Sequence, residues 1–388
     1  MLAVLRATPG RVGASGPTHD ATRLTSRPST HLRARRSTLL HAAEPTTATT
    51  TPTTSFTTAA SGEWEGAAAA FNRDGEPIAL PPNYVPDAFR EWGVEVADWT
   101  TQCSTIAVAP APGAGGDDGV SLSYRLKRLL PSVGCEADAT AFLDEGVAVR
   151  LGNGNGRGGG GAEEGGASLP PAFLGDGAYA LAPPALPTDP ASRPARFEVS
   201  LPLPPAACVA ANGSVSPRRV RAVVSVAAAP ASDRASPRPP ILAGVELFSE
   251  KRYGDYIGGT DSLAGCGGGV GPFARTQALE AGALERGDWS VVRGVVTQSP
   301  PPAGAALTFP PADAARGSDT GRLLLPLGAW VAVRPAANGG VVVEAGVVAT
   351  GSADGGVVRR SGAAEFDAGG TLLCVSLVAE VAGGGRLD

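Results

Sequence analysis

Hydrophobic and polar residues alternate with a period of two in several short segments of this chain. The alternation is clearest in 120–130 and recurs in 196–201, 341–346 and 372–380. Successive side chains of a β-strand point to opposite faces, so this pattern predicts half-buried strands with one apolar face. Many short antiparallel strands bury such a face most simply by closing into barrels or sandwiches. We therefore expect an all-β protein.

Helical periodicity is scarce in comparison. It is found in 86–92, 136–144 and 274–285, and the last of these would bridge two β-rich halves. Stretches rich in glycine and proline, such as 152–166 and 265–271, separate the alternating segments. Such stretches are typical of surface loops, so few and short helices are expected.

Two similar openings mark the starts of the two halves. Gly62 stands two residues before Trp64, and Gly287 stands two residues before Trp289. A glycine at this place lets the backbone turn sharply while the indole folds across the end of a barrel. These four residues are therefore predicted to be structural barrel starts, with both tryptophans packed in a core.

Several segments carry a resemblance to a known family. They are 62–66, 91–96 and 98–103 in the first half, and 322–328, 343–346, 359–360 and 372–380 in the second. In this order they resemble the calycin-like family known as domain of unknown function 3598, which occurs in cyanobacteria and chloroplast-bearing organisms. The resemblance implies two tandem antiparallel lipocalin-like (calycin) β-barrels. It implies no activity, since the family is defined by having none assigned.

The chain divides into four parts on this interpretation. They are a chloroplast transit peptide and disordered tether (1–60), an N-terminal calycin-like β-barrel with low-complexity loop insertions (61–257), a linker (258–283) and a C-terminal calycin-like β-barrel (284–388). Each barrel is expected to have its own core, because roughly 330 residues exceed one ordinary core.

The first sixty residues have the composition of an organelle leader. They hold seven arginines, only two acidic residues (Asp20 and Glu44), and about one serine or threonine in three. The hydroxyl content favours a chloroplast over a mitochondrial address, and we expect the stroma rather than the lumen. Processing is expected near Arg33–Arg36, and Thr46–Thr58 resembles an unstructured tether. No apolar stretch long enough for a membrane span is evident in the sequence.

Removal of the leader changes the chemistry available to the protein. All three histidines, His19, His31 and His41, lie within it. A body without histidine excludes Ser-His-Asp and Cys-His catalysis and most zinc or iron sites, and we expect neither a metal nor a cofactor. Taking seven basic and two acidic residues from 32 and 37 leaves 25 and 35, so the body carries about −10 and nucleic-acid binding is disfavoured.

The cysteines do not suggest a metal site either. They are widely spaced, without a Cys-x-x-Cys pair, at Cys103, Cys135, Cys208, Cys266 and Cys374. Buried free thiols are the favoured interpretation, and a redox-regulated pair of Cys103 with Cys135 is the alternative.

Three classes of function stay open at this point. The favoured one is binding of a small apolar or amphipathic ligand, such as a tetrapyrrole, carotenoid or fatty-acid derivative, with Trp99, Tyr124 and Tyr179 as candidates for the pocket. The second is an enzyme of the bilin-lyase or oxylipin-cyclase type, which would depend on carboxylate, Arg, Tyr or Cys side chains. The third is a structural or assembly factor with filled barrels. Glu63 and Glu65 are expected to face solvent, opposite the Trp64 indole.

The composition of the leader generates a first prediction. Residues 1–60 fused to a fluorescent protein should direct it into plastids, as seen by microscopy. Cytosolic or mitochondrial fluorescence would contradict the address.

Overall fold

The computed structural model describes most of the chain beyond the leader. The described residues are 51–109, 120–131, 141–151, 172–209, 213–230, 239–258, 271–285, 289–298, 322–351 and 356–382. Most of the predicted leader, with its histidines, lies outside them, as do Cys135, Cys266 and Gly287. Every described residue belongs to one compact unit, Ala48–Asp388.

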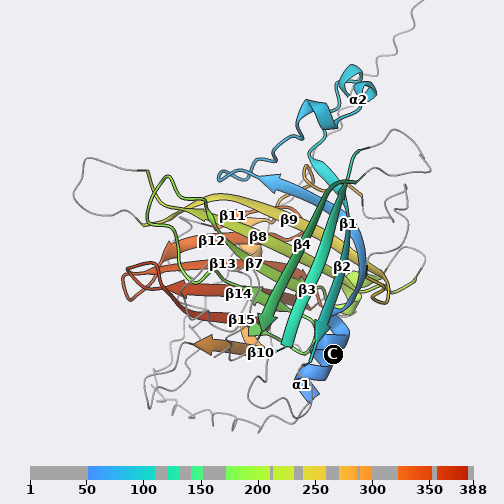
Figure 1. Ribbon diagram of the computed structural model, residues 1–388. Coiled ribbons are helices and arrows are strands. Elements are labelled where there is room, and N and C mark those ends of the chain that lie inside the picture. Colours follow the sequence, from blue (N-terminus) through green and yellow to red (C-terminus); the bar gives the residue numbers. More distant parts are fainter. Residues whose placement is uncertain are drawn as a thin grey trace, which may run out of the picture. The chain divides into compact units, whose positions relative to one another are not determined.

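The first half of the chain forms a curled, antiparallel nine-stranded sheet (Figure 1). In order across the sheet its strands are β4 (Ala141–Leu151), β3 (Val120–Leu129), β2 (Asp98–Val108), β1 (Gly62–Phe71), β9 (Ile241–Gly254), β8 (Arg218–Ala227), β7 (Ala195–Pro202), β6 (Tyr179–Leu181) and β5 (Ala172–Phe173). The first and last long strands of this half, β1 and β9, are therefore neighbours.

The second half forms an antiparallel six-stranded sheet whose strands follow a similar order. Its strands are β10 (Trp289–Gln298), β15 (Leu372–Ala382), β14 (Val357–Phe366), β13 (Val341–Thr350), β12 (Ala329–Pro335) and β11 (Arg322–Leu324). Here too the first and last strands, β10 and β15, pair with each other. The prediction of an all-β fold in two antiparallel halves is confirmed.

Helices are few among the described residues. They are α1 (Thr51–Ala60) and α2 (Asp87–Glu91), with 3-10 turns at Pro82–Tyr84, Pro205–Cys208 and Ala281–Ala283. None of the described helices is long and apolar enough to cross a membrane. The helix predicted at 86–92 is confirmed by α2.

Two other helix predictions are wrong. Of the helix predicted at 136–144, residues 141–144 belong to strand β4, which pairs with β3, and residues 136–140 lie outside the described residues. The expected bridging helix at 274–285 is reduced to one 3-10 turn. Backbone amides in and just before this segment donate to distant parts of the chain instead. The amides of Phe273 (2.8 Å) and Ala274 (3.0 Å) donate to Asp98 Oδ1. The Leu279 amide donates to the Leu325 carbonyl (2.9 Å).

The stretch expected to be a disordered tether is in part a helix. In α1 the Phe56 side chain is 0% exposed and its ring lies 4.7 Å from that of Phe173. It belongs to an apolar cluster at one end of the first sheet that also holds Leu122 and Tyr179. Burial of this aromatic ring supplies the free energy that orders a threonine-rich segment of low helix propensity.

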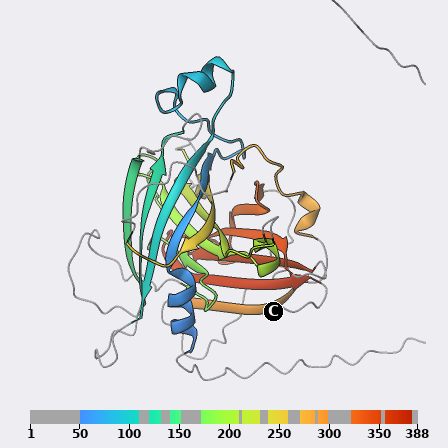
Figure 2. The same cartoon turned by 90° about the vertical axis from the view of Figure 1, so that its right-hand side faces the viewer.

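The two sheets share one apolar core. The cluster includes Val199, Ala222 and Leu247 of the first sheet and Val343 and Leu377 of the second. The dry alternating faces seen in the sequence thus pack against each other, as the adjacent layers in Figure 2 illustrate. This arrangement differs from the expectation of two separate cores.

Small side chains allow the sheets to approach closely. A Cβ atom at Gly362 in β14 would lie 2.6 Å from Val199 Cγ1 in β7. The halves are also joined by an ion pair, because Arg360 Nη1 lies 2.5 Å from Asp176 Oδ2. These contacts hold the first sheet against the second. The opposite face of the first sheet is not part of this interface.

The burial of Phe56 gives the second prediction. Phe56→Ala should lower the free energy of unfolding by about 3 kcal/mol, because it removes a fully buried ring. Chemical denaturation measures this change, and Thr54→Ala, an exposed position on the same helix, is the matched control. Equal stability of the two variants would mean that α1 is not part of the folded body.

Candidate functional site

The face of the first sheet that points away from the shared core holds a cluster of buried polar residues. Strand β8 alternates Val220 and Ala222, which enter the shared core, with Arg219 and Arg221 on the opposite face. In β7, Glu198 stands between two core residues in the same way. Strict alternation therefore delivers charged side chains to one face wherever the other is apolar.

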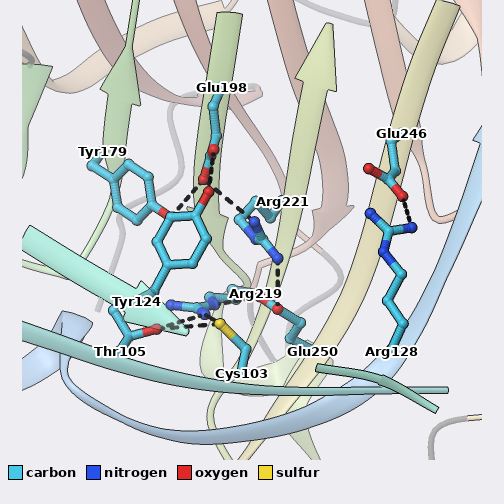
Figure 3. Close-up of polar contacts among 10 residues, drawn as sticks. All are labelled: Cys103, Thr105, Tyr124, Arg128, Tyr179, Glu198, Arg219, Arg221, Glu246 and Glu250. Carbon is cyan, nitrogen blue, oxygen red and sulfur yellow. Dashed lines mark hydrogen bonds and ion pairs between the residues drawn. The ribbon is translucent and has the colours of Figure 1, made fainter. Parts of the chain in front are cut away.

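Two arginines and two glutamates form a continuous network on this face (Figure 3). Arg219 Nε lies 2.6 Å from Glu250 Oε2, and Arg221 Nη2 lies 3.2 Å from Glu250 Oε1. Arg221 Nη1 also reaches Glu198 Oε1 at 3.5 Å. The residues Arg219 and Arg221 are 2% and 1% exposed, so these ion pairs are screened little by solvent.

Two tyrosines complete the network at Glu198. The Tyr124 hydroxyl donates to Glu198 Oε2 at 2.8 Å, and the Tyr179 hydroxyl donates to Oε1 at 2.9 Å. The two rings come from β3 and β6, which lie on opposite sides of the sheet order. The curl of the sheet is what allows both to reach one carboxylate.

Burial and charge set the protonation of these groups. Burial by itself would raise the pKa of Glu250, but the positive charges of Arg219 and Arg221 outweigh it and lower the pKa. Burial, reinforced by the charge of Glu198, raises the pKa of Tyr124 and of Tyr179 far above the usual value. Glu250 is therefore ionised at neutral pH, and both tyrosines are neutral hydrogen-bond donors.

Aromatic rings and small polar groups surround the arginines. The Arg219 guanidinium carbon lies 3.9 Å from the centroid of the Trp64 ring, and that of Arg221 lies 3.8 Å from the centroid of Phe248. Arg219 Nη2 also donates to Thr105 Oγ1 at 3.1 Å. These cation–π contacts stabilise guanidinium groups that have lost their hydration.

Not every donor in the network has a partner. Trp64 Nε1, Arg219 Nη1 and Arg221 Nε are buried and have no hydrogen-bond partner among the described residues. A buried N–H group without an acceptor costs free energy, so it is a place where an acceptor atom of another molecule would be stabilised. The network thus contains buried donors that no described residue satisfies.

The site offers less for metal or thiol chemistry. Among the described residues no group of three His, Cys, Asp or Glu side chains could hold a metal ion. Cys103 lies 3.7 Å from Arg219 Nη2, but burial, together with the charge of Glu250, raises the pKa of its thiol. A neutral thiol is a weak nucleophile.

The second half repeats part of this arrangement. The Arg359 guanidinium carbon lies 4.6 Å from the centroid of the Trp289 ring, as Arg219 lies over Trp64. Arg359 also pairs with Glu380, with Nε–Oε2 at 2.5 Å and Nη2–Oε1 at 2.8 Å. In both halves the tryptophan comes from the first strand, the glutamate from the last, and the arginine from the strand before it.

Steric crowding explains why the first half begins with a glycine, Gly62. Gly62 has φ +148°, and a Cβ atom there would lie 2.6 Å from Arg252 Nε. Trp64, two residues on, is buried. Trp289 is partly buried, and its Nε1 donates to the Leu284 carbonyl at 3.2 Å.

The structure links the three predicted pocket residues through Tyr124. Tyr124 and Tyr179 meet at Glu198, and Tyr124 shares an apolar cluster with Trp99, whose ring is 5.8 Å from that of Tyr84. The two arginines, Glu198 and Glu250 were missed, and Glu250 is fully buried although its segment is typical of a strand end with solvated charges. The available signal was an arginine at every second position of an otherwise apolar strand, which is the pattern of a strand buried on both faces.

The expectation that Glu63 faces solvent is wrong. Its carboxylate is buried, accepts a hydrogen bond from Ser104 Oγ, and accepts another from the Ile257 amide at 2.8 Å. A bulge between Glu63 and Trp64 in the pairing with β9 shifts the register, so both side chains become buried. Glu65 is partly buried and pairs with Lys251 at 3.8 Å.

The buried pair generates the third prediction. Glu250→Gln should lower the free energy of unfolding by about 3 kcal/mol at neutral pH, because it leaves two buried arginines with one carboxylate. The folded pKa of Glu250 is below the unfolded value near 4.5. Its stabilisation is thus complete above that value and is lost as the pH falls through the folded pKa.

Denaturant titrations across this pH range measure both effects. The variant should lose stability less steeply than the wild type below pH 4.5. Asp255→Asn is the control, since Asp255 is exposed and its pair with Arg252 (3.0 Å) should contribute under about 1 kcal/mol. If the two variants were equally stable, the buried pair would not stabilise the fold.

No family model and no curated protein matches the chain. Among solved structures, the crystal structure of a protein with unknown function from Nostoc punctiforme is similar, with 15% identity and a TM-score of 0.40, over 84% of this chain and 98% of that one. That protein is assigned to the DUF3598 family, which is the family that the sequence motifs of this chain resemble.

Proposed function

We propose that this protein binds a small amphipathic molecule on the polar face of its first sheet, the face that points away from the core shared with the second sheet. The observation that carries the proposal is the set of three buried donors without partners, Trp64 Nε1, Arg219 Nη1 and Arg221 Nε. They come from β1 and β8, which lie on either side of β9, and they stand beside aromatic rings. A polar group of the ligand would be oriented by these donors, and the rest of the ligand by apolar side chains.

The apolar contacts would come from the cluster next to the network. It includes Trp64, Trp99, Tyr124, Leu126 and Phe248. The dry alternating strand faces are not available for this purpose, since they are buried between the two sheets. A ligand with a flat or extended apolar part and one polar end fits this surrounding best.

The address narrows the candidate ligands. We propose a plastid location, in the stroma, on the composition of the leader. Plastids are rich in tetrapyrroles, carotenoids and fatty-acid derivatives, and members of each class combine an apolar framework with polar oxygen atoms. These classes are the ones to test first.

An enzymatic role is the second candidate, and one observation favours it. Without histidine, catalysis would need buried Glu, Arg, Tyr and Cys groups, and Glu198, Arg221, Tyr124 and Cys103 lie in one network. The tyrosines, which burial keeps protonated, could donate hydrogen bonds to a bound substrate. A structural role, with the network serving only stability, is the third.

The fourth prediction tests binding directly. Protein purified from its host should carry a small molecule, detected as added mass by native mass spectrometry and identified after solvent extraction. Titration with representative fatty acids, carotenoids and tetrapyrroles should change tryptophan fluorescence and raise the melting temperature. An empty protein that responds to none of them would favour the structural role, and release of a species different from the one supplied would favour the enzyme.

A further inference from the structure

We infer that the polar end of the ligand is a neutral carbonyl group rather than a carboxylate. This inference rests on the proposed function and narrows it to ketones, aldehydes, esters or lactams with an apolar body. Three features of the network carry it: the kind of group that lacks a partner, the charges already present, and the occupation of the carboxylate oxygens.

The groups without partners on nitrogen are all donors. Indole Nε1 of Trp64, Nη1 of Arg219 and Nε of Arg221 each hold a hydrogen and cannot accept one. Three other buried groups without partners lie on the same sheet, Nε of Arg128 and the hydroxyls of Thr101 and Ser200, and all three can donate as well. The ligand atom that meets this set must therefore be an acceptor.

The charges of the network already cancel. Arg219 and Arg221 supply two positive charges, and Glu198 and Glu250 supply two negative charges at distances of 2.6 to 3.5 Å. A carboxylate would add a buried negative charge with no counter-charge left to balance it. Such a charge is costly to remove from water, whereas a carbonyl oxygen accepts the same hydrogen bonds without it.

The carboxylates of the network have little to offer a donor ligand. Glu250 accepts from Arg219 on Oε2 and from Arg221 on Oε1. Glu198 accepts from Tyr124 on Oε2 and from Tyr179 on Oε1. An amine or alcohol would have to share an oxygen that already accepts an internal hydrogen bond, and it would leave the buried donors without a partner. A neutral acceptor is the head group that uses the free donors and disturbs nothing else.

The fifth prediction is a head-group comparison on the full-length wild-type protein. The probes are a straight-chain methyl ketone, the fatty acid of equal chain length and the matching alkane, followed by tryptophan fluorescence and isothermal calorimetry. The ketone should bind at least about tenfold more tightly than the fatty acid at neutral pH. Infrared spectroscopy of a ketone with an isotope-labelled carbonyl carbon should show a lower stretching frequency in the bound ketone than in the same ketone dissolved in an alkane, because the bound oxygen accepts hydrogen bonds.

A matched pair of variants tests the donors. Trp64→Phe removes one free N–H group and keeps an aromatic ring against Arg219, so ketone affinity should fall roughly three- to tenfold. Trp330→Phe is the control, because Trp330 is also buried with Nε1 unpartnered among the described residues, but it belongs to the second sheet. That variant should bind the ketone like the wild type.

Each outcome separates this inference from the proposed function. Tighter binding of the fatty acid, or equal binding of ketone and acid, would overturn the carbonyl assignment and leave amphipathic binding standing. Absence of binding for all three probes and for the larger plastid ligands would overturn both. The wild-type comparison does not depend on whether Trp64→Phe folds, and an unchanged carbonyl frequency in bound ketone would also overturn the assignment.

Discussion

Burial of strand β8 on both faces is the constraint on which the rest of the structure depends. One face of the strand carries Val220, Ala222 and Val224 into the core shared by the two sheets. The other carries Arg219 and Arg221, which cannot reach solvent and must find partners inside the protein. Glu250 and Glu198 on the adjacent strands supply them. A dry core between the sheets thus forces a polar network inside the first one.

The two halves bury an arginine between the same kinds of side chain. A tryptophan on the first strand, an arginine on the penultimate strand and a glutamate on the last strand recur as Trp64, Arg219 and Glu250 and as Trp289, Arg359 and Glu380. The halves differ in what surrounds the arginine. The second sheet adds Arg334 and Glu344, 3.8 Å apart, but among the described residues only the first sheet adds two tyrosines that donate to one buried glutamate. These aromatic donors around a buried carboxylate are the reason to look for function there.

A buried ionic network is weak evidence of stability by itself, because desolvation offsets much of the attraction between its charges. It does fix the groups around it in one arrangement. Arg221 touches Glu198, Glu250 and the Phe248 ring, so its position is set from three directions. Donors held in this way do not need to be reorganised when a ligand arrives, which is the property expected of a selective binding site.

The sequence by itself determined the all-β class, the division into two antiparallel halves and the short helix α2, because alternation with period two and glycine-rich loops are local patterns. It also indicated Tyr124 and Tyr179, although not that they share Glu198. Only the tertiary structure decided which alternating face is a core and which is a site, since a strand buried on both sides has no solvent face for the pattern to mark. The bulge that buries Glu63 and the packing that orders α1 depend on pairing between distant segments, and no local pattern encodes such pairing.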